Sequence, residues 1–128
     1  MANIVQTYGA STPVGFTANT LVSLGFGAEA LSDEVDNSTA KSLAMDLELN
    51  FSWLATATGT ADVYLVKSAD GTTFADEAEK ANLLFIGSVT PDSALTTNVV
   101  TKVIRVEQLP QKWKLLVVNS DGAITFNS

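Results

Sequence analysis

The chain is 128 residues long, which suits a single domain with its own hydrophobic core. Because it contains neither cysteine nor histidine, it offers no disulfide, no thiolate nucleophile, no metal site built on these residues and no histidine general base. Its formal net charge of −7 repels phosphate, so we expect no binding to nucleic acid.

The first third of the sequence has only modest strand patterns, in residues 3–8, 20–26 and 29–36, and glycines and a proline break it into short pieces. Residues 1–20 are either an arm that pairs with a sheet edge of another chain or an ordinary first strand. The candidate interface consists of the larger apolar side chains of this segment: Ile4, Val5, Tyr8, Val14 and Phe16.

Residues 43–53 carry the clearest local pattern, because six apolar side chains alternate with mostly polar ones. Successive side chains of a strand point to opposite faces, so this period of two predicts a half-buried antiparallel strand. The predicted buried face consists of Leu43, Met45, Leu47, Leu49, Phe51 and Trp53.

Two further strands are predicted in the middle of the chain. Residues 61–67 are rich in side chains that favour sheets, and the pair Asp70-Gly71 then signals a turn. Residues 75–81 contain good helix formers, but one or two isolated turns are marginal in water, so we expect a loop. Residues 83–89 predict the second strand, which ends before Pro91.

The last part of the chain predicts strands at residues 99–107 and 113–119, followed by a short connection and a return strand at residues 123–126. Residues 113–119 are apolar on both faces, so both faces of this strand should be covered.

About eight short strands with no long helix predict an all-β fold. We expect an antiparallel β-sandwich that is jelly-roll-like and has at most one short helix. The sequence shows no internal repeat and no linker, so residues 1–128 should form one domain, with residues 1–20 as its arm or edge strand.

No pattern for catalysis or metal binding is present. The acidic runs at residues 33–36 and 76–79 lack the ligand spacing of an EF-hand and are interpreted as surface charge. The sequence has no Gly-x-Ser-x-Gly motif and no complete phosphate-binding loop. We therefore expect a protein that is not an enzyme, with no catalytic residues, no metal and no cofactor.

The apolar runs are far shorter than the roughly 20 residues that a membrane-spanning helix needs. The N-terminal residues lack the basic region and the continuous apolar stretch of a signal peptide. We expect no membrane contact and synthesis in the cytoplasm, which fits the absence of disulfides.

Trp53 and Trp113 are the two candidates for a platform that stacks against a ligand, as aromatic side chains do in carbohydrate-binding sandwich modules. Both lie in register with apolar neighbours, which favours burial in the core. A carbohydrate-binding module remains the alternative from another functional class.

Three features of the sequence resemble small β-sandwich proteins of tailed-bacteriophage virions, which include decoration (cement) proteins and tail-associated subunits. They are the Ser-x-Asp-Gly-x-x-Phe phrase at residues 68–74, the corner Gln108-Leu109-Pro110, and the hairpin that begins at residues 113–119. The resemblance implies a subunit without catalytic residues that forms dimers or trimers and binds the major capsid protein or other virion subunits. A capsid decoration protein of the virion is the leading hypothesis, and a tail or head-to-tail component is the alternative.

Overall fold

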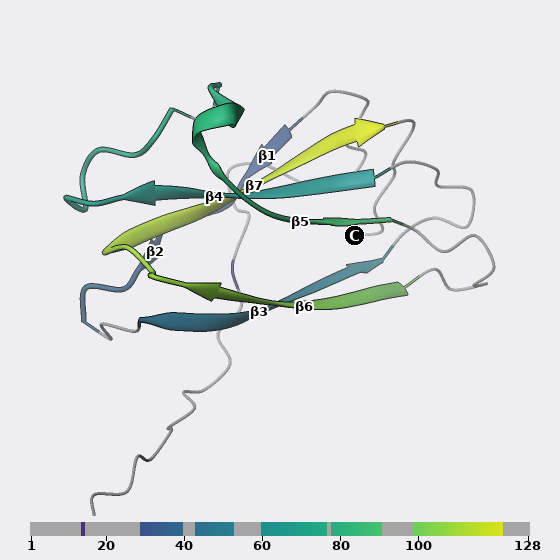
Figure 1. Ribbon diagram of the computed structural model, residues 1–128, viewed down its shortest axis with the longest axis horizontal. Coiled ribbons are helices and arrows are strands. Elements are labelled where there is room, and N and C mark those ends of the chain that lie inside the picture. Colours follow the sequence, from purple (N-terminus) through teal and green to yellow (C-terminus); the bar gives the residue numbers. More distant parts are fainter. Residues whose placement is uncertain are drawn as a thin grey trace, which may run out of the picture.

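The computed structural model describes residues 14, 29–39, 43–52, 60–76, 78–90 and 99–121. Within these ranges it contains seven strands and one short 3-10 helix. The strands form two antiparallel sheets that lie in two layers (Figure 1). The predicted all-β antiparallel sandwich is therefore confirmed.

The larger sheet has five strands in the order β1-β7-β4-β5, with β2 paired to β7 just beyond β1. Its members are β1 (Glu29–Leu31), β2 (Val35–Asp36), β4 (Thr60–Ser68), β5 (Leu84–Val89) and β7 (Lys112–Asp121). Strand β7 lies between neighbours on both sides, whereas β5 lies at an edge.

The smaller sheet consists of β3 (Ala44–Ser52) and β6 (Val99–Glu107), in which Leu47 lies opposite Ile104 and Met45 opposite Val106. The chain changes sheet four times, between β2 and β3, between β3 and β4, between β5 and β6, and between β6 and β7. Most contacts therefore join segments that are distant in the sequence.

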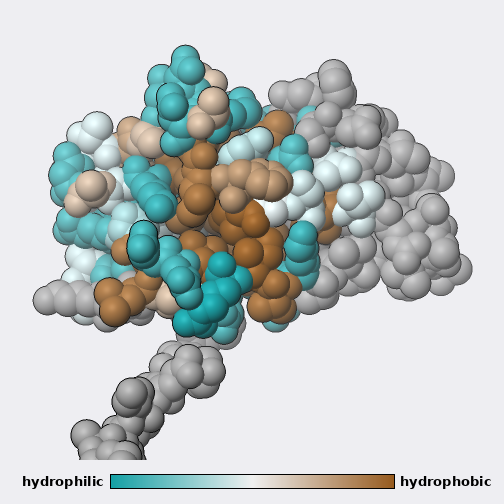
Figure 2. Space-filling view, viewed as in Figure 1, coloured by the Kyte–Doolittle hydropathy of each residue, from teal (hydrophilic) through white to brown (hydrophobic). Residues whose placement is uncertain are grey.

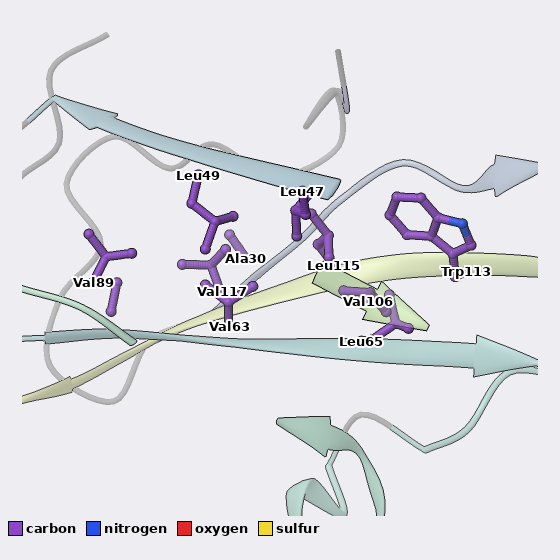
Figure 3. Close-up of a cluster of buried hydrophobic side chains, with 11 residues drawn as sticks. Ala30, Leu47, Leu49, Val63, Leu65, Val89, Val106, Trp113, Leu115 and Val117 are labelled. Carbon is purple, nitrogen blue, oxygen red and sulfur yellow. The ribbon is translucent and has the colours of Figure 1, made fainter. Parts of the chain in front are cut away.

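The main core lies between the sheets and is built by the alternation of apolar side chains along each strand. Figure 3 shows how the two layers contribute side chains to the cluster. The smaller sheet contributes Leu47, Leu49 and Val106, and the larger sheet contributes Ala30, Ala61, Val63, Leu65, Val89, Trp113, Leu115 and Val117. Val14 is partly buried and packs against the same cluster.

A second apolar cluster lies on the other face of the larger sheet. There Val66, Leu116 and Val118 are buried beneath residues 69–83, a segment that we name the covering loop. The loop contributes partly buried Phe74 and Leu83 to this cluster. Both faces of β7 are thus covered, as its sequence predicts.

A backbone hydrogen bond and an ion pair hold the covering loop in place. Ala75 donates its backbone N–H to the carbonyl of Lys67 at 3.0 Å. Lys80, in the 3-10 helix η1 (Lys80–Asn82), forms an ion pair with Glu29 of β1 at 2.7 Å. The short helix lies over the larger sheet in Figure 1, and the predicted loop at residues 75–81 contains no longer helix among its described residues.

Five strand predictions match β3, β4, β5, β6 and β7 to within a few residues. One predicted core residue is wrong, because Leu43 is 82% exposed. Leu43 lies just before β3 begins, beyond the last pair of the register, Ala44 opposite Glu107, so the strand alternation does not extend to it. The strand patterns at residues 3–8, 20–26 and 123–126 lie outside the described residues.

Candidate interaction surface

The described residues contain no group of three or more acidic, cysteine or histidine side chains that could hold a metal ion. In the same part of the chain, no helix is long and apolar enough to cross a membrane. A hollow of about 260 Å³ lies between the covering loop and the start of β5, lined by Leu65, Lys67, Ala75, Asn82, Leu83 and Leu84. Its lining is mostly apolar, and Lys67 is its one ionisable side chain.

The edge strand β5 exposes apolar side chains and carries no charged residue of its own. Its sequence, Leu-Phe-Ile-Gly-Ser-Val, contains no ionisable residue, and β4 is its only partner among the described strands. Leu84 is 42% exposed and Phe85 is 52% exposed, and Ile86 beside them is half-buried. Figure 2 shows hydrophobic side chains gathered in the middle of the face in view, where Figure 1 places β5 and β6. We name Leu84, Phe85 and Ile86 the β5 patch.

Phe85 is held in position by the ring of Tyr64 on β4. The two residues lie opposite each other across the strands, and their ring centres are 5.4 Å apart in an edge-to-face arrangement. Such pairs stabilise neighbouring strands beyond the area that they bury. The exposed ring is therefore a fixed part of the surface.

A β-bulge shapes the middle of β5. Val63 pairs with Gly87, whereas the next residue, Tyr64, pairs with Phe85, so Ile86 is the extra residue on β5. Gly87 is buried against the smaller sheet, and a Cβ atom there would lie 2.7 Å from Cδ1 of Ile104. A side chain at this position would force the end of the Ile104 side chain to move, because the two sheets approach each other closely here.

The second half of β5 is protected by a lysine from the other sheet. Nζ of Lys102 donates a hydrogen bond to the carbonyl oxygen of Ser88 at 3.0 Å. A bulge and a lysine are both devices that prevent a sheet edge from pairing with further strands. The unprotected part of this edge is consequently its first half, where the β5 patch lies.

The outer face of the smaller sheet has the opposite character. Asp46 and Glu48 on β3 are exposed there beside Arg105 and Glu107 on β6. Nη1 of Arg105 lies 3.2 Å from Oδ1 of Asp46, and its Nε lies 3.5 Å from Oε1 of Glu107. Val103 is 62% exposed on this face, but charged side chains surround it. The exposed charged side chains of this face favour contact with water.

The Ser-x-Asp-Gly-x-x-Phe phrase forms the corner at which the covering loop begins. Oδ1 of Asp70 accepts hydrogen bonds from the backbone N–H groups of Thr72 at 2.8 Å and Thr73 at 2.7 Å. These bonds lower the pKa of Asp70 from 3.8 to about 2. Gly71 has a φ of 77°, which favours glycine. The phrase therefore has a structural role.

Behind the corner, the phenylalanine of the phrase reaches the larger sheet. The ring of Phe74 lies 4.4 Å from Nζ of Lys114 on β7, within the range of a cation–π contact. This contact fixes the start of the covering loop over β7.

The structure places only two of the residues predicted as candidate sites. Trp113 is 4% exposed and belongs to the main core, so its ring has no face available to a ligand. Val14 is partly buried and packs against the same core. The other candidates lie outside the described residues: Ile4, Val5, Tyr8, Phe16 and Trp53.

The β5 patch is the surface that sequence reasoning missed. The strand itself was predicted, but its exposure depends on its place at the edge of the sheet. The one signal in the sequence is that residues 81–91 contain no charged side chain, whereas Lys80 and Asp92 lie directly on either side of them.

No known protein family, curated protein or solved structure significantly matches this chain. The fold and its surface define a class, an all-β sandwich with one exposed apolar edge.

Proposed function

We propose that this chain is a structural subunit, without catalytic activity, that binds other protein subunits in a tailed-phage particle as a capsid decoration (cement) protein. The observation that carries the proposal is the β5 patch. Apolar side chains that stay exposed together on a sheet edge are typical of protein–protein contacts. The location in a phage particle, on its shell, is proposed from the resemblance in the sequence.

The ionisable groups around the described strands support a structural role. The carboxylate of Asp70 accepts backbone hydrogen bonds in a turn, and that of Asp46 pairs with Arg105. Asp62 accepts a hydrogen bond at 2.6 Å from the hydroxyl of Ser88, which joins β4 to β5. These carboxylates organise turns and strand pairs, which is what a scaffold requires.

A decoration protein would stabilise a shell by burying interface area across neighbouring capsid subunits. At about 25 cal/mol per Å², a standard interface of about 1,600 Å² offers roughly 40 kcal/mol before costs. Lost rotational freedom and side-chain ordering consume most of this gain. Even a weak net contribution per copy becomes substantial when it is repeated over a shell.

The test compares phage particles that are produced with and without this chain. We expect the chain to sediment with the particles and its loss to lower the temperature at which they release DNA. The variant Phe85→Lys should reduce the bound amount at least tenfold, whereas Val103→Lys should bind as the unmodified chain does. Particles that never contain the chain would contradict the proposal. If the chain is bound but located on the tail in an electron-microscope map, the tail alternative replaces the shell.

A further inference from the structure

We infer that the covering loop is a strap, which opens and closes over the larger sheet while the rest of the sandwich stays folded. In the closed form described above, the loop buries Val66 and Leu116. In the open form, these side chains would join Tyr64 and the exposed ring of Phe85 in one apolar face. The two forms therefore differ in how much apolar surface the molecule presents on this side.

The covering loop contains no fully buried residue in the part that the structure describes, residues 69–76 and 78–83. Even Phe74 and Leu83, which pack against the cluster beneath the loop, are only half-buried. The main core is instead built of fully buried side chains from both sheets. Local opening costs least where few apolar contacts are buried, so the loop should open more readily than the sheets separate.

Few hydrogen bonds join the covering loop to the sheet. Among the described residues, a single backbone bond does so, from the N–H of Ala75 to the carbonyl oxygen of Lys67. The other backbone bonds of the loop, which the N–H groups of Glu79, Asn82 and Leu83 donate, have their acceptors within the loop itself. These bonds move with the loop, so opening does not have to break them.

The packing beneath the covering loop is incomplete. The hollow of about 260 Å³ lies there, with Ala75 and Leu83 of the loop on one side and Leu65 of β4 on the other. Protein interiors are normally close-packed, and side chains that border a void lose part of their mutual attraction. The loop therefore gives up less packing energy on opening than a close-packed segment of the same length would.

Both ends of the strap are fixed, whereas a surface ion pair holds its middle. At one end the hydrogen bonds of Asp70 fix the corner, and at the other end Leu84 begins β5 and pairs with Leu65. Between these ends, Lys80 forms its ion pair with Glu29, and the two side chains are 35% and 37% exposed. Ion pairs that water reaches contribute little to stability. This one is consequently a weak latch, which favours the closed form without locking it.

The absence of cysteine allows a direct test by thiol labelling in the full-length chain. Val63 and Val66 both lie on β4 and are both 0% exposed, but Val63 belongs to the main core and Val66 to the cluster beneath the loop. Val63→Cys is therefore the matched control for Val66→Cys. Without denaturant, we expect a thiol-reactive dye to label Val66→Cys at least about tenfold faster than Val63→Cys, because local opening is less costly than global unfolding.

Two further measurements separate local opening from global unfolding. Urea promotes each reaction in proportion to the surface that the reaction exposes. Below the unfolding transition, the labelling rate of Val66→Cys should therefore depend only weakly on urea, whereas that of Val63→Cys should rise steeply. Adding Val106→Ala, which weakens the main core, should accelerate the labelling of Val63→Cys and leave that of Val66→Cys unchanged within about twofold.

Equal labelling rates with the same dependence on urea would overturn the inference, because both thiols would then be reached only by global unfolding. Acceleration of both variants by Val106→Ala would overturn it for the same reason. If Val66→Cys does not fold, hydrogen exchange at the N–H of Ala75 in the unmodified chain decides the question. Exchange that is fast and nearly independent of urea supports the strap, and exchange at the rate of global unfolding contradicts it.

Discussion

The outer faces of the two sheets differ: one is apolar and covered by a loop, and the other is charged and exposed to water. On the larger sheet the outer face is apolar, and the covering loop buries Val66 and Leu116. On the smaller sheet the outer face carries Asp46, Glu48 and Arg105 and is left to water. The larger sheet thus has a core on each side, and the smaller sheet has one. The comparison teaches that stability is concentrated around β7, which is buried on both faces.

The largest expected effect comes from removing a side chain beneath the covering loop. Leu116→Ala should lower the free energy of unfolding by about 2–5 kcal/mol, because Leu116 is 1% exposed and its loss leaves a cavity. Val103→Ala on the outer face of the smaller sheet should change it by less than about 0.5 kcal/mol. Denaturation in urea measures both. Equal losses would mean that the covering loop forms no second core.

The next effect concerns the seam where the two sheets approach each other. Gly87→Ala should cost about 1–3 kcal/mol, since its Cβ would meet Cδ1 of Ile104 at 2.7 Å. Ile104→Val removes that atom, so the double variant should be less destabilised than the sum of the two single variants. Strict additivity in the same urea titrations would show that the sheets are not in contact at this point.

These two sites also show how far the sequence alone can lead. Alternation predicts the burial of Leu47 and Leu49, and the two apolar faces of β7 predict that something covers its outer side. Neither pattern says that the covering loop supplies that cover, because Phe74 and Leu83 reach the sheet only through the turn at Asp70.

The exposure of the β5 patch is even harder to predict from a sequence pattern than the position of the covering loop. An apolar strand of this kind is equally compatible with the middle of a sheet and with its edge, and only long-range pairing places it at the edge. The close approach at Gly87 likewise depends on Ile104, which comes from another sheet. Alternation also predicted burial for Leu43, and it failed where the partner strand ends.

A smaller loss is expected at the opposite edge of the larger sheet. Between β1 and β2, the hydroxyl of Ser32 accepts the buried backbone N–H of Leu115 at 2.7 Å. Ser32→Ala leaves that N–H without its partner, which should cost about 1 kcal/mol, the low end of the range for a buried donor. Ser32→Thr keeps the hydroxyl and is the control. If thermal unfolding does not distinguish the two variants, the hydroxyl is not needed to satisfy Leu115.

The corner of the covering loop predicts a pH dependence. The pKa of Asp70 is about 2 in the folded chain, below the ordinary 3.8, so its ionised form favours folding above about pH 4. This contribution should disappear as the pH falls from about 4 to 2. Asp70→Asn should therefore be less stable than the unmodified chain at pH 7, and the difference should shrink towards pH 2. A difference that is constant with pH in denaturation experiments would contradict the role of the charge.

The smallest effect is expected on the water-facing sheet. Arg105 pairs with Asp46 and Glu107, but all three side chains are exposed, so Arg105→Gln should cost less than about 1 kcal/mol. That small loss should vanish in 0.5 M salt, roughly the range where screening acts over only a few ångströms. Paired urea titrations at low and high salt measure the change. A loss of several kcal/mol that persists in salt would mean that this face is buried in an assembly, and the contrast between the two outer faces would then not hold.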